Sequence, residues 1–253
     1  MKISVIGVIP ARLGSTRLQE KVLRPIAGRP MIRHVWERVK QARKLDEVII
    51  ACDDPRIEAC AREFGARAVM TSAAHTTGSS RVAEAAAREN AAIVINIQGD
   101  EPMIHPSSID ALAEVLLKNS QLDAATLAVP SRDPEAYLNP NVVKVVCDRE
   151  GNALFFSRAP LPFYREGGKT TAFLKHLGIY GYRKDFLLKF VGWKPGHLED
   201  CEKLEQLRIL EEGFKIRVVE TPHDSWSVDT LEDLRTVEEK IKQAVFAKTA
   251  GVV

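Results

Sequence analysis

Short apolar runs alternate with amphipathic stretches along the first half of the chain. The runs are rich in β-branched residues, which is typical of strands buried on both faces of a sheet. Between them, apolar residues recur at helical spacing, as along 31–42. The pattern predicts strands at 3–9, 47–51, 66–70, 93–97 and 124–129, and helices at 31–42, 55–64, 80–88 and 106–118. This alternation predicts an α/β fold, in which a mostly parallel twisted sheet carries helices on both faces.

The alternation changes after residue 130. Two short strands at 142–146 and 153–156 flank the polar turn at 148–152, which predicts a β-hairpin. The elements expected beyond the Pro/Gly-rich loop 159–171 are a strand at 174–182, helices at 185–190 and 198–212, a strand at 215–220 and a terminal helix at 230–244. We therefore expect one domain over residues 1–246, with 130–190 as a smaller hairpin-containing subregion. Residues 247–253 are expected to form a frayed tail.

Composition narrows the class of protein without naming an activity. The chain has 253 residues, of which 45% are hydrophobic and 28% charged, and its formal net charge is +2. These values are ordinary for a globular domain, and basic residues that are spread out predict no nucleic-acid partner. No apolar run approaches the roughly 20 residues that span a bilayer, so no membrane partner is expected. The first apolar run is too short for a signal peptide, which predicts a cytoplasmic protein.

The four cysteines are expected to be free thiols. Cys52, Cys60, Cys147 and Cys201 form no C-x-x-C pair and have no histidine at zinc-ligand spacing. Buried thiols of a protein in a reducing compartment fit this spacing better than a metal site or a disulfide framework does.

The loop that follows the first strand has the composition of a triphosphate site. It contains Gly, Ser and Thr residues together with three cations, Arg12, Arg17 and Lys21. Small residues let backbone N–H groups approach phosphate oxygens, and the cations neutralise charge that would repel a nucleophile. The spacing matches neither a Walker A motif nor G-x-G-x-x-G. The loop therefore predicts a nucleotide site that is not of the common ATPase or dehydrogenase type.

Two acidic residues are candidate metal ligands. Asp100 lies in the sequence Gln98-Gly99-Asp100-Glu101-Pro102, directly after the strand at 93–97. Ligands bind at the carboxyl ends of parallel strands, so this loop and the loop at 10–21 are expected to lie together. Carboxylates there suit Mg²⁺ that bridges substrate phosphates. Asp229 is the second candidate, just before the last helix. The alternatives are that Asp100 only begins a turn and that Asp229 only precedes a helix capped by Thr230 and Asp233.

Five sequence strings point to one family. They are Pro-Ala-Arg-x-x-Ser-Thr-Arg-Leu at 10–18, Asn-Ile-Gln-Gly-Asp-Glu-Pro-Met at 96–103, Phe-Ser-Arg-Ala at 156–159, Lys-His-Leu-Gly-Ile-Tyr-Gly-Tyr at 175–182 and Leu-Glu-Gln-Leu-Arg at 204–208. Each is short, but in this order and with the predicted elements between them they closely resemble the 3-deoxy-manno-octulosonate cytidylyltransferases. The resemblance extends from about residue 3 to residue 240.

The resemblance implies a nucleotidyltransferase-like fold and an activity for lipopolysaccharide synthesis. The enzyme would transfer CMP from CTP to 3-deoxy-manno-octulosonate (Kdo) and release pyrophosphate, with Mg²⁺ as cofactor and as a homodimer. The residues implied for CTP are Arg12, Ser15, Lys21, Arg81 and Gln98, and those implied for the sugar acid are Arg158, His176, Tyr180, Glu205 and Gln206. Asp100 and Asp229 would hold the metal and, with Arg12 and Lys21, act in catalysis. Gln98 is open to a role toward either substrate.

The sugar-facing residues have ordinary alternatives when they are considered without the resemblance. Arg158 alone would be assigned to a surface ion pair, because exposed pairs are common and weak. His176 alone would be assigned to the core, because backbone groups readily satisfy a neutral imidazole. Glu205 and Gln206 would belong to the solvated face of the helix at 198–212.

The chain departs from the family pattern at two places. Gln19 and Glu20 stand where the family usually has Pro-Gly, which makes the loop less preset and adds an acid beside the phosphate site. Ser80 stands where the family has an acid, which removes a charge that would orient Arg81 or cap the following helix.

Three other hypotheses stay open at this point. The enzyme could act on another acidic sugar, either sialic acid or an 8-amino relative of Kdo. It could also be a nucleotide-binding relative that lacks catalysis. For the dimer contact we expect the segment 153–173, because Phe155, Phe156, Leu161 and Phe163 have no place in the predicted core.

Overall fold

The computed structural model describes residues 4–15, 18–165 and 172–249. Arg17, one of the three loop cations of the sequence prediction, lies outside the described residues, as do Ile3 and residues 250–253. The main sheet consists of β1 (Val5–Ala11), β4 (Glu47–Cys52), β5 (Arg67–Met70), β6 (Ile93–Asn96), β7 (Ala124–Ser131), β8 (Lys144–Cys147), β9 (Ala153–Ser157), β10 (Phe173–Arg183) and β11 (Ile216–Glu220). A two-stranded ribbon, β2 (Pro25–Ile26) and β3 (Arg29–Pro30), stands apart.

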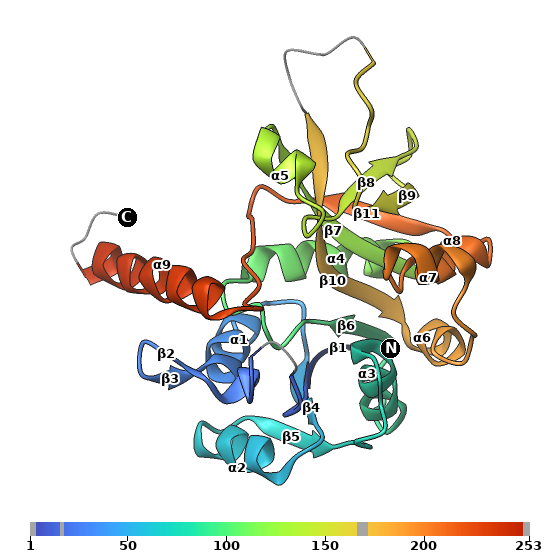
Figure 1. Cartoon of the computed structure of the whole chain (residues 1–253). Helices are drawn as coiled ribbons and strands as arrows, with labels where there is room; N and C mark the ends of the chain where they lie inside the picture. The colour runs from blue at the N-terminus through green and yellow to red at the C-terminus, as the bar shows by residue number, and fades with distance from the viewer. Residues whose placement is uncertain (1–3, 16–17, 166–171, 250–253) are drawn as a thin grey trace.

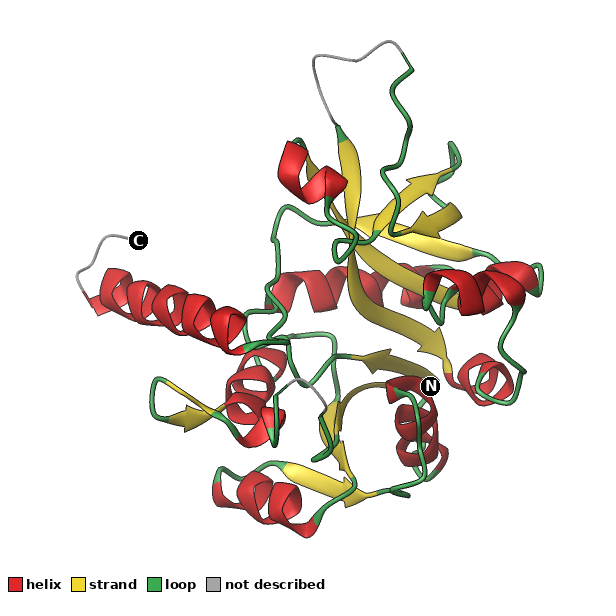
Figure 2. Cartoon of the chain, viewed as in Figure 1, coloured by secondary structure: helices red, strands yellow, loops and turns green. Residues whose placement is uncertain are grey.

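The helices are α1 (Met31–Val39), α2 (Pro55–Glu63), α3 (Gly78–Ala87), α4 (Pro106–Lys118), α5 (Pro134–Leu138), α6 (Lys184–Phe190), α7 (His197–Glu202), α8 (Leu207–Glu211) and α9 (Leu231–Thr249), with a 3₁₀ turn, η1, at Lys21–Leu23. Figures 1 and 2 show the sheet in the middle of the molecule with helices on both sides, and α9 projecting from the body. No helix within the described part of the chain is both long and apolar enough to cross a membrane.

The sheet is mixed but mostly parallel along its path, as predicted. Its strand order is β11-β7-β10-β6-β1-β4-β5, and β8 and β9 extend from β10. Strands β6, β1, β4 and β5 are parallel, whereas β10 runs antiparallel to both β6 and β7. Because β4 and β6 flank β1 on opposite sides, the chain reverses its direction of winding at β1. A crevice therefore forms outside the carboxyl ends of β1 and β6.

Successive strand residues enter two separate hydrophobic cores, one on each face of the sheet. In β1, Ile9 belongs to the core that includes residues of α1, α2 and α4, whereas Val8 belongs to the core that includes residues of α3, α6 and α8. This alternation follows from the two-residue repeat of a strand. Both residues are fully buried, so β1 is covered on both faces and its apolar sequence is explained.

The predicted helix at 198–212 is wrong. Two short helices, α7 and α8, stand in its place, because Lys203 adopts a left-handed conformation with φ of 52° and ends α7. The turn that follows directs Leu204 and Leu207 into the core beside α3. Gly213, with φ of 77°, lies beyond the end of α8 and confirms the predicted stop. The helix α5 and the β2–β3 ribbon are not predicted, because both are too short to show a period.

The other elements are confirmed to within a few residues. The hairpin predicted across 148–152 is the β8–β9 pair, and the helix predicted at 106–118 matches α4 at both ends. The terminal helix extends to Thr249, so residues 247–249 of the predicted frayed tail are helical instead.

The segment expected to form the dimer contact is partly core. Phe156 is fully buried and Phe155 packs beside it, so the expectation that both lack a place in the core is wrong. Phe163 is 81% exposed, and Leu154 and Leu138 nearby are also exposed. The difference between Leu154 and Phe156 coincides with an irregularity in β9: Val146 pairs with Phe155 and Cys147 pairs with Ala153, so Leu154 lies between two pairs as the extra residue of a bulge. The dimer itself stays a prediction.

Candidate active site

A cleft of about 370 Å³ opens where the sequence predicts ligand binding, outside the carboxyl ends of β1 and β6. The loops after both strands contribute to it, together with the N-terminal end of α3 and the segment before α9. Its lining residues are Pro10, Arg12, Ser15, Lys21, Val22, His75, Thr76, Thr77, Gly78, Arg81, Gln98, Gly99, Asp100 and Asp229. The structure therefore brings together the residues that the resemblance assigned to CTP and to the metal.

Gly99 lets the two strand-end loops meet. A Cβ atom at this position would lie 2.7 Å from the carbonyl oxygen of Pro10, which is closer than real Cβ contacts allow. Any larger residue would push the loop after β6 away from the end of β1. The glycine of the Gln-Gly-Asp string thus has a packing role that places Asp100 beside the β1 loop.

Lys21 lies between the two candidate metal ligands. Its Nζ atom is 2.5 Å from Asp100 Oδ2 and 3.0 Å from Asp229 Oδ1. Burial lowers the pKa of Lys21, but the two carboxylates outweigh burial, so the pKa lies above its ordinary value. The ammonium group therefore stays charged, and two carboxylates 129 residues apart in sequence converge on one cation.

Glu101 follows Asp100 and turns away from the cleft. It is 7% exposed and accepts a hydrogen bond from Ser225 Oγ. Burial raises the pKa of its carboxyl to about 7, although the hydrogen bond from Ser225 opposes the shift. The two adjacent carboxyl groups thus lie in different surroundings: that of Asp100 faces the cleft, and that of Glu101 lies in the protein interior.

The start of α9 confirms the capping prediction and does not exclude the metal one. Thr230 Oγ1 accepts from the backbone N–H of Asp233 at 3.1 Å, and Asp233 Oδ2 accepts from the N–H groups of Asp229 and Thr230. This reciprocal cap uses the side chains of Thr230 and Asp233. The side chain of Asp229 is not needed for it and points to Lys21 instead.

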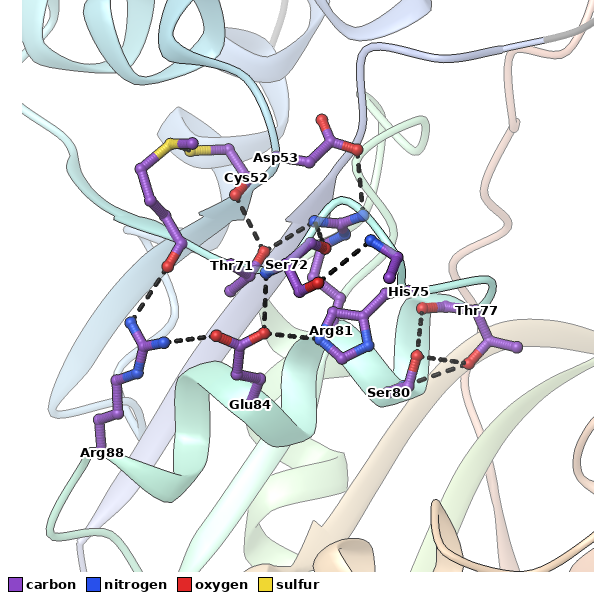
Figure 3. Close-up of polar contacts among 12 residues, drawn as sticks. Cys52, Asp53, Thr71, Ser72, His75, Thr77, Ser80, Arg81, Glu84 and Arg88 are labelled. Carbon is purple, nitrogen blue, oxygen red and sulfur yellow. Dashed lines mark hydrogen bonds and ion pairs between the residues drawn. The ribbon is translucent and has the colours of Figure 1, made fainter.

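Arg81 reaches the cleft from α3 and is held by an acid that the sequence analysis missed. Figure 3 shows its guanidinium directed at Asp53 Oδ2, 3.0 Å away, and at Thr71 Oγ1, 2.7 Å away. Asp53 also accepts from the N–H of Leu13 at 2.9 Å and so links Arg81 to the β1 loop. The signal was available, because Asp53 directly follows β4, at the same edge of the sheet as Asp100.

The substitution at Ser80 leaves both the helix cap and Arg81 intact. Thr77 caps α3 by accepting from the N–H of Ser80 at 3.2 Å, and Ser80 Oγ donates to the carbonyl of Thr77 at 3.0 Å (Figure 3). Because Asp53 orients Arg81, the expected loss of orientation does not occur. His75 also lines the cleft, and its Nε2 lies 2.7 Å from Glu84 on α3.

The remaining CTP candidates face the cavity. Arg12 is exposed and forms no ion pair with a described residue, so its charge is available to a ligand. Gln98 is half-buried and donates to Asn96 Oδ1 over 3.4 Å, a long hydrogen bond that a ligand can replace. Glu20 adopts a left-handed conformation with φ of 52° directly before Lys21. An acid with a Cβ thus stands at a backbone position that favours glycine.

The residues assigned to the sugar do not line this cleft. His176 lies on β10, is 9% exposed, and its Nε2 is 3.0 Å from Thr126 Oγ1. Its ring contacts those of Phe156 and Tyr180, with centroids 4.9 and 5.5 Å apart. Burial lowers the pKa of His176 to about 3 and raises that of Tyr180, so both side chains are neutral. In the structure described, His176 and Tyr180 are therefore buried residues of the hydrophobic core.

The other three residues assigned to the sugar lie at the ends of elements: Arg158 directly follows β9, and Glu205 and Gln206 directly precede α8. Arg158 donates to the carbonyl oxygens of Glu202 and Pro140 at 2.8 and 3.0 Å. Glu205 accepts from Ser79 Oγ at 2.6 Å, next to the cleft-lining Gly78, and burial raises its pKa. Gln206 is 5% exposed, and its Nε2 has no hydrogen-bond partner among the described residues.

Lys144 supports this side of the molecule and was missed by the sequence analysis. It is fully buried and donates to the carbonyls of Asn139, Val142 and Arg158, at 3.0, 2.7 and 2.6 Å. Burial lowers its pKa. A buried lysine bonded only to carbonyls fixes the loop at 139–142 and the backbone of Arg158. No motif in the sequence marks it.

The cleft has the groups that a nucleoside triphosphate and a divalent cation need. The described residues contain no cluster of three or more His, Cys, Asp or Glu side chains that could hold a metal alone. Two carboxylates that already converge on one cation fit Mg²⁺, which is usually bound by one or two carboxylates together with substrate phosphates. Arg12, Lys21 and Arg81 supply positive charge around them.

Comparison with known proteins agrees with the site. The family model described as cytidylyltransferase matches residues 6–216. The 3-deoxy-manno-octulosonate cytidylyltransferase of Solibacter usitatus is 48% identical over 242 residues, which cover 96% of each chain. That of Syntrophobacter fumaroxidans is 52% identical over 237 residues, covering 92% of this chain and 95% of the relative.

A solved structure shows the same fold. A CMP:2-keto-3-deoxy-manno-octonic acid synthetase complexed with CTP superposes with a TM-score of 0.90 and 39% identity, covering 95% of this chain and 99% of the other. The fold and the cleft thus define a nucleotidyltransferase of the cytidylyl-transferring class. Among these enzymes, the chain belongs to the 3-deoxy-manno-octulosonate cytidylyltransferase family.

Proposed function

We propose that this protein transfers CMP from CTP to Kdo and releases pyrophosphate, supplying an activated sugar for lipopolysaccharide synthesis. The observation that carries the proposal is the convergence of Lys21, Asp100 and Asp229 in a cleft at the ends of β1 and β6. The names of the relatives and the CTP in the solved structure support the choice of nucleotide and sugar.

The cleft residues would bind and orient the triphosphate. Arg12, Ser15 and Lys21 approach from the β1 loop, and Arg81, held by Asp53, approaches from α3. Their charges would screen the phosphate oxygens, so that the anomeric hydroxyl of an anionic sugar can reach the α-phosphorus. The new bond joins that oxygen to the α-phosphorus, and the bond to the β-phosphate oxygen breaks.

Mg²⁺ is the cofactor that we propose, held by Asp100 and Asp229. When bound, it would withdraw charge from the phosphate oxygens and lower the barrier to attack. Lys21 contacts the same carboxylate oxygens, so it would have to share or leave them when the metal binds. The position of Lys21 relative to the two carboxylates would therefore show whether the metal is bound.

For the sugar side we propose Arg158, His176, Tyr180, Glu205 and Gln206. The best support is Gln206, because a buried donor without a partner costs about 1–3 kcal/mol and a ligand oxygen would satisfy it. His176 is neutral and would offer a hydrogen bond to a hydroxyl, whereas Arg158 is the cation available for the carboxylate. Glu205 links this group to the cleft through Ser79.

Homodimerisation and a cytoplasmic location complete the proposal. Exposed apolar side chains at Leu138, Leu154 and Phe163 gather in the 130–190 subregion, which supports a contact surface there. The cysteines are free thiols, which is ordinary in the reducing compartment where CTP is available. Light scattering at micromolar concentration tests the dimer, and a monomer would overturn it.

The test of the function is pyrophosphate release from CTP and Mg²⁺ with Kdo, 8-amino-Kdo or N-acetylneuraminate in parallel reactions. We expect release with Kdo and much less with the other sugars. A preference for either other sugar would overturn the choice of substrate but keep the reaction class. Tight CTP binding without release on any sugar would identify a non-catalytic relative.

A further inference from the structure

The segment 221–229 carries Asp229 to the cleft without regular secondary structure of its own. It joins β11 to α9 and passes beside the loop 98–105 that follows β6. A segment without a backbone ladder holds a side chain in place only if other contacts fix it. Those contacts decide how accurately Asp229 faces Asp100.

Two contacts tie this segment to the residues at Asp100. The Ser225 hydroxyl donates to the Glu101 carboxyl, and both side chains are buried, at 5% and 7% exposed. The backbone N–H of Val228 donates to the carbonyl oxygen of Asp100 at 2.9 Å. One contact thus involves the residue after Asp100, and the other involves the residue before Asp229.

Further contacts fix the earlier part of the segment. Thr221 Oγ1 and Ser108 Oγ on α4 are 2.7 Å apart, and both residues are buried. The rings of His223 and His105 stack with centroids 3.6 Å apart. Asp224 pairs with Lys175 of β10 at 2.8 and 3.0 Å. These contacts lie farther along the chain from Asp229 than Ser225 does.

We propose that Glu101 and Ser225 are positioning residues, and that their hydrogen bond sets the spacing between the carboxylates of Asp100 and Asp229. The proposal rests on the proposed function, because it concerns how these two carboxylates hold a divalent cation. Glu101 shares its backbone with Asp100, so a shift of one carboxyl group moves the other. Ser225 transmits the same constraint to the segment that ends in Asp229.

Because Glu101 is buried, it is better placed to position Asp100 than to contact a ligand itself. A carboxyl group taken out of water costs free energy unless its hydrogen bonds are satisfied, and an apolar residue of similar volume would fill the interior at a lower cost. Groups that hydrogen-bond to metal ligands commonly change metal affinity about 10–100-fold when they are removed. Glu101 and Ser225 act one step further away, through the backbone of Asp100 and the segment that ends in Asp229, so we expect the lower end of that range. A purely structural hydrogen bond would change stability alone.

The test compares Ser225→Ala with Ser108→Ala. Each variant removes one buried hydroxyl hydrogen bond that involves the segment 221–229, but only Ser225 contacts the residue next to Asp100. Mn²⁺ is titrated into the CTP-bound protein and followed by electron paramagnetic resonance, with thermal unfolding recorded for both variants. We expect Ser225→Ala to weaken Mn²⁺ binding about 10-fold and Ser108→Ala to leave it within about twofold.

A third variant separates the hydrogen bond from the charge. Glu101→Gln keeps a carbonyl oxygen that accepts from Ser225 but removes the ionisable group, and we expect near-normal Mn²⁺ binding. The proposal is overturned if Ser225→Ala binds Mn²⁺ like the wild type, or if Ser108→Ala weakens binding equally. It is also overturned if Glu101→Gln binds Mn²⁺ about 10-fold more weakly than the wild type, a comparison that stands even if Ser225→Ala fails to fold. Failure of the wild type to bind Mn²⁺ with CTP would instead contradict the proposed function.

Discussion

The two sides of the proposed site are built from opposite chemistry. On the nucleotide side, Lys21 pairs with Asp100 and Asp229 inside an open cleft, so its partners are charged and reachable. On the sugar side, His176 and Tyr180 are buried, neutral and in contact with other rings. Ionic contacts at a cleft can be exchanged for a charged ligand, whereas a packed aromatic cluster offers a ligand only neutral groups.

This difference indicates how each side would respond to substrate. The nucleotide side keeps cations and carboxylates in place before CTP arrives, which reduces the rearrangement needed on binding. The sugar side has one buried donor, Gln206 Nε2, without a partner in the described protein. We therefore expect changes on the nucleotide side to affect turnover and metal binding, and changes at His176 to affect stability first.

The largest expected effect is on turnover at the nucleotide side. Asp100→Ala should lower kcat by about 1,000-fold or more, because loss of a metal ligand costs several kcal/mol of transition-state stabilisation. Pyrophosphate release measures it. Asp185→Ala removes an exposed carboxylate on α6 and should leave the rate unchanged. Near-normal activity of Asp100→Ala would remove Asp100 from the metal site.

The next effect is on the pH dependence of stability at the sugar side. The pKa of His176 is about 3 when folded and near 6.5 when unfolded, so the unfolded chain binds a proton first as the pH falls. Above pH 6.5 the histidine is neutral in both the folded and the unfolded state, so it does not lower the free energy of unfolding. Between pH 6.5 and pH 4 that free energy should decline by about 3 kcal/mol. His176→Gln should remove that decline in urea unfolding curves. An unchanged slope against pH would show that His176 is accessible to protons in the folded protein.

A smaller effect concerns Lys21, and its sign is diagnostic. Lys21→Ala should tighten Mn²⁺ binding in the absence of CTP about 10-fold, since a hydrogen bond to a charged group contributes about 1.5–3 kcal/mol and the ammonium competes with the metal. The same variant should lose turnover. Isothermal titration with Mn²⁺ alone measures the first change. Weaker Mn²⁺ binding would mean that Lys21 supports the metal site instead of competing for it.

The smallest effect is at the family departure beside Lys21. Glu20→Gly should raise the free energy of unfolding by about 0.5 kcal/mol, because a residue with a Cβ is strained at φ of 52°. Thermal unfolding measures the change. Gln19→Gly, one residue earlier, provides the matched control and should not stabilise the protein. Destabilisation by Glu20→Gly would show that its ion pair with Arg56 outweighs the strain.

The sequence pattern itself indicates several of the cleft residues, whereas it indicates none of the residues proposed for the sugar, and the reason is physical. Strand-end loops are marked by short apolar runs followed by Gly, Asp or Arg, so Arg12, Lys21 and Asp100 could be placed from the pattern. Asp229 could be placed there only with the resemblance. His176 and Gln206 have no local signal that separates a ligand from a core residue, and the resemblance alone assigned them.

The errors and omissions have two kinds of cause, one local and one long-range. The break between α7 and α8 depends on a left-handed Lys203, a conformation that lysine gives no sign of in sequence. Asp53 and Lys144 act through long-range contacts, to Arg81 and to the backbone of Arg158. The place of Asp53 after a strand is visible in the sequence, but its partner is not, because these contacts join residues that are far apart in sequence.

The most direct test of a metal site shared by Asp100 and Asp229 is a crystal structure of the protein with CTP and Mn²⁺, with the metal located by its anomalous signal. We expect a metal peak between Asp100 and Asp229, the triphosphate along the β1 loop, and Lys21 displaced from the carboxylates toward the phosphates. A metal peak elsewhere, or a triphosphate bound with Lys21 still bridging both carboxylates, would contradict this expectation.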